Sequence, residues 1–155
     1  MSDWISGETL WGEMALAWRP DYSDWDQMVQ LLARDIMLKD VRTISEDKKV
    51  AFARLVMMRH NIGALPVLGK NRKLVGIITQ RDADFVGSNI SDLHVADLMT
   101  TTLVKGKETT TLREIVEWMI KTGIQRIPIT DDKDRLVGLV TQTSVIRAIA
   151  KYNIL

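Results

Sequence analysis

The chain contains the same segment twice, and the two copies align without a gap. The stretch LVGIIT over residues 74–79 returns as LVGLVT over residues 136–141, a shift of 62 residues. The same shift places identical residues on each other before this stretch: Asp35 and Asp97, Met37 and Met99, Glu46 and Glu108, Met57 and Met119, Pro66 and Pro128. Two copies at so long a period predict a pair of small domains facing each other across a pseudo-twofold axis. Any cleft between them then occurs in two related versions.

Composition narrows the classes of function. A duplicated unit within 155 residues builds a proper core by burying one copy against the other, so neither half is expected to be stable alone. Lysine and arginine number 21 against 20 aspartate and glutamate, which argues against a basic stripe for nucleic acid or an anionic membrane. The chain has no cysteine and only two histidines, His60 and His94, so neither a metal site nor thiol catalysis is expected.

No targeting or membrane signal is found in the sequence. The apolar runs are shorter than the roughly 18 residues of a spanning helix, and the first residues lack a basic flank followed by an apolar core. The expected compartment is therefore the cytoplasm.

Each copy is predicted to run strand, helix, strand, strand, helix. Apolar residues recur at helical spacing over 112–120, after a capping box at 111–114, and the first copy matches this pattern over 50–57. Both helices are expected to end at equivalent positions, Asn61 and Gly123, because these residue types tolerate the left-handed conformation that closes a helix.

The predicted strands are short apolar runs separated by polar turns. The first strand of each copy is expected at 41–44 and at 103–104. The later pairs are expected at 65–68 with 74–79, and at 127–130 with 136–141. Their length and branched residues indicate buried strands, and the last helices are expected to begin at Gln80 and Gln142.

Residues 1–33 differ in character from the repeat. Four tryptophans stand seven residues apart: Trp4, Trp11, Trp18 and Trp25. That spacing suits a coiled-coil seam, but Gly7, Gly12 and Pro20 interrupt the run and indicate short helices instead. We expect this extension to pack on the repeat and complete its core. The alternative is a surface for self-association or for a partner.

The end of the repeated strand is the best candidate for a site. A buried strand ends in Thr79 and a helix opens with Asp82, which places a hydroxyl and a carboxylate near outward-pointing backbone N–H groups. These groups suit a polyol. The equivalent residues of the second copy are Thr141 and Ser144. The alternative interpretation is that Asp82 and Ser144 only cap their helices.

The succession of a helix, IGALPV over 62–67, a turn and LVGIITQRD over 74–82 resembles a cystathionine-beta-synthase (CBS) domain. The second copy makes the chain similar to a tandem pair of the Bateman-module type, over about residues 34–151. The resemblance implies an α+β fold: CBS domains at 34–90 and 91–155, related by a pseudo-twofold axis, with a helical extension over 1–33. It also implies a regulatory, non-catalytic module that binds AMP, ADP or ATP, with S-adenosylmethionine or an NAD-type ligand as second choices.

Carried over residue by residue, the resemblance implies a main cleft centred on the first copy. Asp82 would accept hydrogen bonds from the ribose hydroxyls, with Thr79 beside it, and Ile77 would line the base. The rest of the implied set is Gly63, Ala64, Thr100, Val104, Ile124, Gln125 and Arg126.

The second cleft is implied by the same resemblance. Thr141 and Ser144 take the ribose positions and Leu139 lines the base, while Leu38, Arg42, Ile62 and again Gly63 come from the first copy. Ser144 departs from the family pattern. Because a neutral hydroxyl cannot accept a pair of hydrogen bonds as strongly as a carboxylate, this cleft is expected to bind more weakly or stay empty.

Arg126 precedes the Ile127–Pro128 pair, a position at which members of the family often contact phosphate; the first copy has Ala64 there. The phosphate ends of both clefts converge near the pseudo-twofold axis in this architecture, so Arg126 could serve either. We expect it to complete the Asp82 cleft. The alternative is a surface arginine paired with Asp131 or Asp132.

These observations predict a nucleotide-sensing module that signals to a partner or to an attached protein. Apolar residues on more than one face of the helices, such as Met58 and Trp118, predict a homodimer. No combination of nucleophile, base and orienting residue can be assembled for catalysis. The alternative is an interaction scaffold with degenerate clefts, and the chain could also be part of a larger enzyme or transporter.

Overall fold

The computed structural model of the chain describes residues 30–87 and 92–152. Residues 1–29 of the extension predicted over 1–33, together with residues 88–91 and 153–155, lie outside the described residues. In the first repeat the elements are α3 (Ala33–Ile36), β1 (Ile44–Ser45), α4 (Val50–His60), β2 (Ala64–Leu68), the 3-10 turn η2 (Lys70–Arg72), β3 (Leu74–Thr79) and α5 (Gln80–Phe85). In the second they are α6 (Val95–Leu98), α7 (Leu112–Thr122), β4 (Arg126–Thr130), β5 (Leu136–Thr141) and α8 (Gln142–Lys151).

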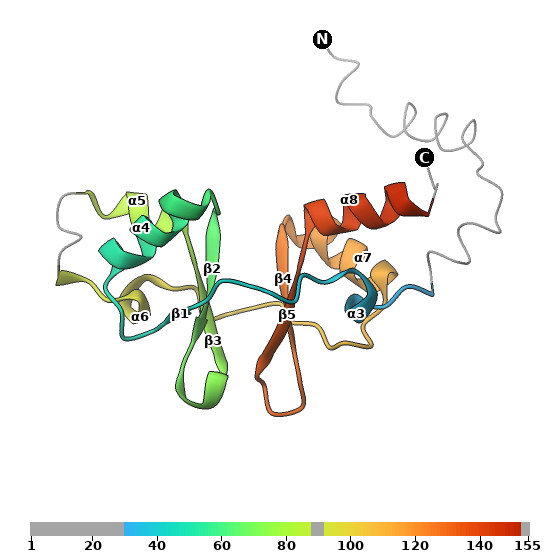
Figure 1. The fold of residues 1–155 in the computed structure, drawn as a ribbon, viewed down its shortest axis with the longest axis horizontal. Helices are drawn as coiled ribbons and strands as arrows, with labels where there is room; N and C mark the ends of the chain where they lie inside the picture. The colour runs from blue at the N-terminus through green and yellow to red at the C-terminus, as the bar shows by residue number, and fades with distance from the viewer. Residues whose placement is uncertain (1–29, 88–91, 153–155) are drawn as a thin grey trace, which may run out of the picture.

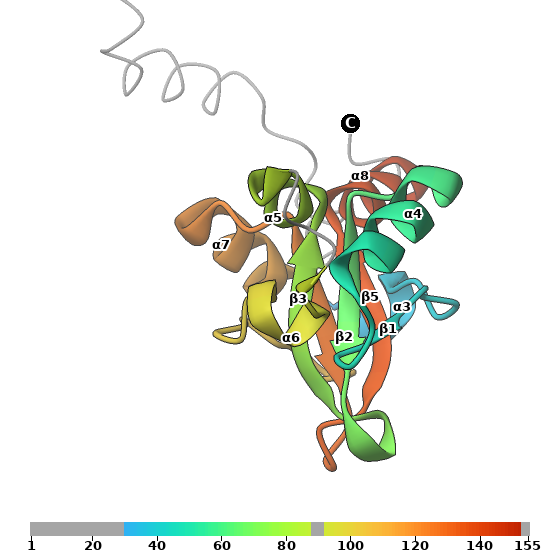
Figure 2. The ribbon, with the colours of Figure 1, turned by 90° about the vertical axis from the view of Figure 1, so that its left-hand side faces the viewer.

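The predicted α+β fold of two related units is confirmed. Strands β2 and β3 pair antiparallel with Pro66 opposite Ile77, and β4 and β5 pair in the same way with Pro128 opposite Leu139. Helices α4, α5, α7 and α8 gather on the side of the molecule opposite to the two hairpin turns (Figure 1 and Figure 2). The 62-residue shift therefore describes both the sequence and the arrangement of the elements.

The helix ends follow the sequence. Helix α4 ends at Asn61 with φ 51° and α7 at Gly123 with φ 72°, both left-handed as predicted. At the start of α7, the Thr111 hydroxyl accepts a hydrogen bond from the Glu114 N–H at 3.2 Å, and the Glu114 carboxylate accepts one from the Thr111 N–H at 2.9 Å. The predicted capping box is thus formed.

The first strand of each repeat was predicted wrongly. Strand β1 covers Ile44–Ser45 rather than 41–44, and it pairs parallel with β2. The described residues show no strand at 103–104; instead Gly106 makes a single bridge to Ile129. Since Val41, Leu103 and Val104 line clefts, their apolar character reflects the cleft and not a sheet.

Each short lead-in segment crosses to the other repeat. In the core of the second repeat, Leu31 and Ala33 pack with Ile115 and Ile127. In the core of the first repeat, Val95 of α6 packs with residues such as Leu65. Leu31 and Ala33 belong to the range predicted as the extension. Because each core contains residues from the other half, the repeats are interlocked rather than merely adjacent.

Two glycines allow the crossing segments to approach the strands. A methyl group added at Gly76 would lie 2.7 Å from the Met99 sulfur and 2.9 Å from the Thr100 carbonyl oxygen. At the equivalent Gly138, it would contact Met37 in the same way. Backbone hydrogen bonds then tie the crossing segment to the strand, as between the Thr100 N–H and the Ile77 carbonyl at 2.8 Å.

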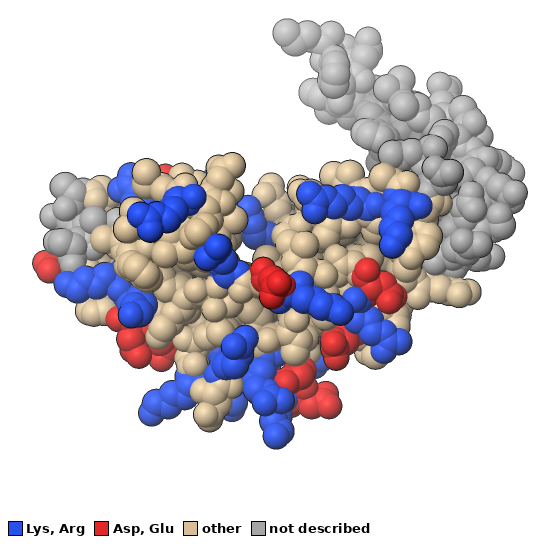
Figure 3. Space-filling model, in the orientation of Figure 1, with Lys and Arg blue, Asp and Glu red and all other residues tan. Residues whose placement is uncertain are grey.

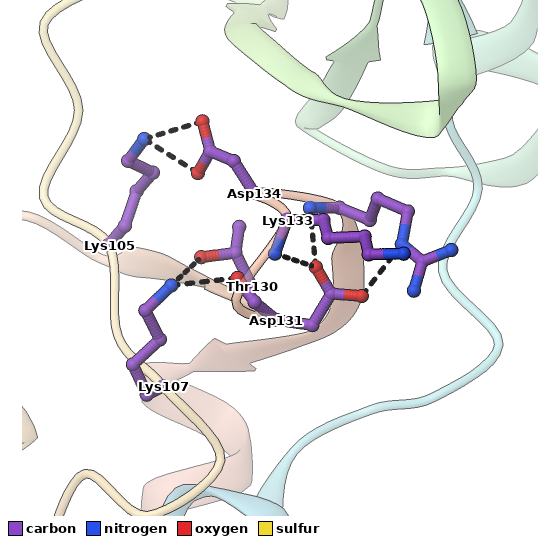
Figure 4. Close-up of polar contacts among 7 residues, drawn as sticks. Lys105, Lys107, Thr130, Asp131, Lys133 and Asp134 are labelled. Atoms are coloured by element: carbon purple, nitrogen blue, oxygen red, sulfur yellow. Dashed lines mark hydrogen bonds and ion pairs between the residues drawn. The ribbon is translucent and has the colours of Figure 1, made fainter.

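The turn between β4 and β5 is organised by Asp131, as Figure 4 shows. Its carboxylate accepts backbone N–H bonds from Lys133 and Arg135 at 2.9 Å and the Arg135 Nε–H at 2.8 Å. Donation from the Arg135 backbone is the largest of the influences that lower the pKa of the Asp131 carboxyl below its ordinary range. Asp134 pairs with Lys105 at 2.9 Å. The aspartates at 131–134 are turn residues, as predicted.

Candidate functional site

Two clefts between the repeats are related by the 62-residue shift, and the larger of this pair opens where α4 ends and α8 begins. Its volume is about 620 Å³, within the range of small-molecule sites. Figure 3 shows this face of the molecule hollowed between its two halves, with lysine and arginine side chains beside the hollow. We call it the large cleft. It is lined by Leu38, Asp40, Val41, Arg42, His60, Asn61, Ile62, Gly63, Ala64, Gln125, Arg126, Leu139, Thr141, Gln142 and Thr143.

The second cleft, here the small cleft, lies at the equivalent place in the other repeat. Its volume is about 280 Å³. It is lined by Ala64, Ile77, Thr79, Thr100, Thr102, Leu103, Val104, Ile124, Gln125 and Arg126. The 62-residue shift carries Leu38, Asp40, Val41, Arg42 and Ile62 of the large cleft onto Thr100, Thr102, Leu103, Val104 and Ile124 of the small one.

Most of the residues predicted for the two clefts are brought together. The predicted main cleft corresponds to the small cleft, which contains every predicted residue except Asp82 and Gly63. The predicted weaker cleft corresponds to the large cleft, which contains every predicted residue except Ser144. Gly63, which the sequence associated with both clefts, lines the large cleft.

Asp82 lies in the first turn of α5, beside the small cleft. Its Oδ2 accepts the Thr79 N–H at 2.9 Å, while the Thr79 hydroxyl accepts the Asp82 N–H at 3.1 Å. The capping role considered from the sequence is therefore real. Within the described part of the chain, the other carboxylate oxygen, Oδ1, takes part in no hydrogen bond or ion pair. That oxygen keeps its capacity to accept hydrogen bonds.

Ser144 uses its hydroxyl within its own cap. Ser144 Oγ accepts the Thr141 N–H at 2.7 Å and donates to the Thr141 carbonyl at 2.8 Å, and the side chain is buried. It lines a separate depression of about 160 Å³, which shares Leu38 with the large cleft and is also lined by Arg147 and Tyr152. Ser144 therefore has less remaining hydrogen-bonding capacity than Asp82.

Arg126, the first residue of β4, lines both clefts. The pairing with Asp131 or Asp132 that the sequence left open is not made, and the Asp131 carboxylate binds Arg135 at 2.8 Å instead. The Arg126 side chain forms no ion pair or hydrogen bond with any residue in 30–87 or 92–152, whereas its backbone belongs to the β4–β5 pairing. It is half-buried, and a partly desolvated guanidinium without a partner favours an anionic ligand.

The two clefts differ in charge. Among the described residues that line the large cleft, Arg42 and Arg126 are the cations and Asp40 is the single carboxylate. Arg126 is the single charged residue among the described residues that line the small cleft, whose other side chains are apolar or hydroxylic. The large cleft is thus better suited to phosphate and the small cleft to an uncharged group.

Several lining residues were missed by sequence reasoning. Asp40, His60 and Thr143 of the large cleft and Thr102 and Leu103 of the small cleft were not proposed. His60 was assigned to the end of its helix, where it does lie, but that end borders the cleft. The repeat shift could have indicated Thr102 and Leu103, because they match residues that flank the predicted Arg42.

The described residues contain neither a candidate metal site nor a membrane-spanning helix. Over 30–87 and 92–152, no three histidine, aspartate or glutamate side chains lie close enough to hold a metal ion. None of the helices described there is long and apolar enough to cross a membrane.

A family comparison agrees with this geometry. The model of the CBS domain matches twice, at residues 33–84 and 95–151. The chain belongs to the CBS-domain family. The two matches make it a tandem CBS pair, as the sequence predicted.

Among sequence relatives, inosine-5'-monophosphate dehydrogenase of Thermoplasma acidophilum is 39% identical over 124 residues, which cover 77% of this chain and 24% of that enzyme. The corresponding enzyme of Methanocaldococcus jannaschii is 37% identical, over 74% of this chain and 23% of the enzyme. The chain therefore spans about a quarter of the length of these relatives.

Solved structures show the same fold. The CBS domain pair of protein MJ0100, in complex with 5'-methylthioadenosine and S-adenosyl-L-methionine, is 28% identical with a TM-score of 0.70, covering 78% of this chain and 97% of that one. CBSX2 in complex with AMP is 24% identical with a TM-score of 0.72, over 79% of this chain and 98% of that one.

Proposed function

We propose that this CBS pair binds adenosine-type ligands in the clefts between its repeats and regulates an attached or partner protein, without catalysis. The observation that carries the proposal is Arg126, a half-buried guanidinium that lines both clefts and has no partner among the described residues. A charge held in this way favours a ligand with complementary charge.

The ribose is expected to bind beside Asp82. Because the Thr79 N–H holds Oδ2 at 2.9 Å, the carboxylate is oriented and Oδ1 is available for a hydroxyl donor. Apolar side chains, including Ile77, Val104 and Ile124, form the wall against which an adenine ring would pack. Ser144, the equivalent of Asp82, does not line the large cleft and uses its hydroxyl within its own cap, so we expect weaker ribose binding there.

The ligands of the structural neighbours support the adenosine class. The MJ0100 pair holds 5'-methylthioadenosine and S-adenosyl-L-methionine, and CBSX2 holds AMP. The dehydrogenase relatives match this chain over about a quarter of their length, which supports a regulatory module attached to, or acting on, another protein.

A helix surface offers a route for the signal. Large apolar side chains are exposed on all four major helices: Phe52, Leu55 and Met58 of α4, Phe85 of α5, Ile120 of α7 and Ile146 of α8. These helices lie on one side of the molecule (Figure 1 and Figure 2), and large apolar patches on a protein surface mark interfaces. We propose that it joins two copies of the chain into a homodimer, whose mass light scattering at micromolar concentration would report. A monomer mass would contradict it.

The ligand proposal is tested by calorimetry and thermal denaturation with adenosine, 5'-methylthioadenosine, AMP and ATP, using guanosine as the base control. Binding at 100 times the dissociation constant adds about 2.7 kcal/mol of stability. Asp82→Ala removes charge-assisted hydrogen bonds worth about 1.5 to 3 kcal/mol, so adenosine affinity should fall roughly tenfold to a hundredfold.

The matched control is Asp84→Ala, because Asp84 lies two residues further along the same helix and pairs with Arg54 on the surface. Its adenosine affinity should equal that of the unmodified chain. If no adenosine compound raises the melting temperature, or if Asp82→Ala binds normally, the ligand proposal is wrong and the interaction scaffold is favoured.

A further inference from the structure

One guanidinium lies between two clefts. Arg126 lines both, and the residue at the equivalent position of the first repeat, Ala64, also lines both but carries no charge. The duplicated architecture therefore places two equivalent residues at the junction of the two clefts, and of these two only Arg126 carries a guanidinium.

The Arg126 side chain lies closer to the large cleft than to the small one. A methyl group added at Gly63 would lie 2.8 Å from the Arg126 Nη2 and 3.8 Å from its Cζ, so the guanidinium lies directly over Gly63. Gly63 lines the large cleft and not the small one. In the free protein, Arg126 therefore lies on the side where Arg42 adds a second guanidinium.

We propose that Arg126 makes the two clefts antagonistic for phosphate-bearing ligands and leaves them independent for adenosyl ligands without phosphate. This inference rests on the proposed function. A phosphate in the large cleft holds Arg126 over Gly63, and the small cleft then has no cation among its described lining residues. By thermodynamic linkage, a phosphate in the small cleft weakens the large cleft by the same factor.

The chemistry of the small cleft strengthens the contrast. Without Arg126, a phosphate there would face apolar side chains such as Ile77 and Val104, with the Asp82 carboxylate beside Thr79. Burying an unpaired charge next to apolar groups and a like charge is unfavourable. An adenosyl ligand with an uncharged or thioether tail has no such requirement. The pair would thus respond to the ratio of phosphorylated to unphosphorylated adenosine compounds.

The test is a two-site calorimetric titration with AMP and, separately, with adenosine. For each ligand, the titration gives the ratio of the second dissociation constant to the first. In the unmodified chain this ratio should be at least about fivefold larger for AMP than for adenosine, and we call this difference the excess AMP gap. Arg126→Gln should weaken the first AMP roughly tenfold to a hundredfold and remove this excess gap. Arg113→Gln, which removes an exposed arginine of α7 outside both clefts, is the charge control and should keep the gap.

Two further variants keep Arg126 and change either the number of arginines at the clefts or the position of the Arg126 side chain. Ala64→Arg gives the first repeat its own guanidinium, so the second AMP should bind more tightly and the excess gap should close. Gly63→Ala pushes the flexible end of Arg126 away from the large cleft. The cleft that binds AMP first should then change, as seen by which amide signals move in the first half of an NMR titration.

The outcomes separate this inference from the proposed function. If neither adenosine nor AMP binds, both proposals are overturned. If both ligands bind and the excess AMP gap is absent, or persists unchanged in Ala64→Arg and Arg126→Gln, the ligand proposal stands and the coupling through Arg126 is wrong.

Discussion

The two repeats have the same framework and different linings. Where segments cross between the halves, equivalent positions carry the same residues: Met37 and Met99 pack against Gly138 and Gly76. Where residues face the clefts, the chemistry changes, since Arg42 corresponds to Val104. The comparison shows that interlocking requires the same contacts in both halves, whereas the clefts are free to differ. One scaffold therefore carries one charged cleft and one largely apolar cleft.

The largest expected effect tests whether the two halves fold as one unit. Leu65 and Ile127 are equivalent, completely buried residues, and each core includes a segment from the other repeat. Leu65→Ala and Ile127→Ala should each lower the free energy of unfolding by about 2 to 5 kcal/mol. In both variants, denaturation followed by circular dichroism should remain a single transition. Two transitions, of which only one moves, would show that the repeats unfold separately.

The crossing contacts give the next largest effect. Gly76→Ala places a methyl group 2.9 Å from the Thr100 carbonyl, a backbone atom that cannot move without breaking the bond to Ile77. Overpacking of this kind should cost about 1 to 3 kcal/mol in urea denaturation. The control is Gly63→Ala, whose methyl group meets only the flexible end of Arg126 and should change stability little. Equal losses in the two variants would contradict this account of the crossing.

The helix starts differ between the repeats and predict a smaller effect. Helix α7 has the Thr111 cap, whereas α4 has Lys49 at the equivalent position with no side-chain cap. Thr111→Ala should therefore cost about 1 kcal/mol of stability, measured by thermal denaturation. Thr111→Ser keeps a capping hydroxyl and should cost less. An equal loss in Thr111→Ser and Thr111→Ala would show that the cap does not account for the effect.

The turn at Asp131 predicts the smallest effect, on the pH dependence of stability. Its pKa is lowered because the ionised carboxylate accepts hydrogen bonds from Arg135 and Lys133. Because the pKa is lower in the folded state, the Asp131 carboxylate stabilises the fold at pH values above the ordinary aspartate range. This stabilisation is lost as the pH falls below about 4. The stability gap between the unmodified chain and Asp131→Asn should be present at pH 7 and narrow towards pH 3. A gap that widens in acid would contradict this.

Much of the fold follows from the sequence because its signals are local. The left-handed ends at Asn61 and Gly123 and the Thr111 cap depend on residues close together in the chain, and their predicted positions are confirmed. The first strands were predicted wrongly because a short apolar run does not show whether it pairs in a sheet or lines a cleft. Leu103 and Val104 line a cleft.

The candidate site could be predicted only in part. The repeat shift and the family resemblance identified Arg126, but its position over Gly63 depends on how the strands of the two halves meet. The sequence also ranked the clefts by Asp82 against Ser144 alone. It could not indicate that the cleft expected to be weaker has a volume of about 620 Å³ against about 280 Å³. That difference arises from how distant segments, including residue Asp40 and the end of α4 at His60, are placed in space.

The most direct test of ligand binding between the repeats is an NMR titration of the ¹⁵N-labelled chain with AMP. The account predicts shifted amide signals around the clefts, first at large-cleft residues such as Gly63 and Thr143 and then, at higher concentration, at small-cleft residues such as Thr102 and Val104. Signals from the hairpin turn at 131–135 should stay in place. The absence of shifts at millimolar AMP, or shifts confined to the exposed helix surface, would contradict the central claim.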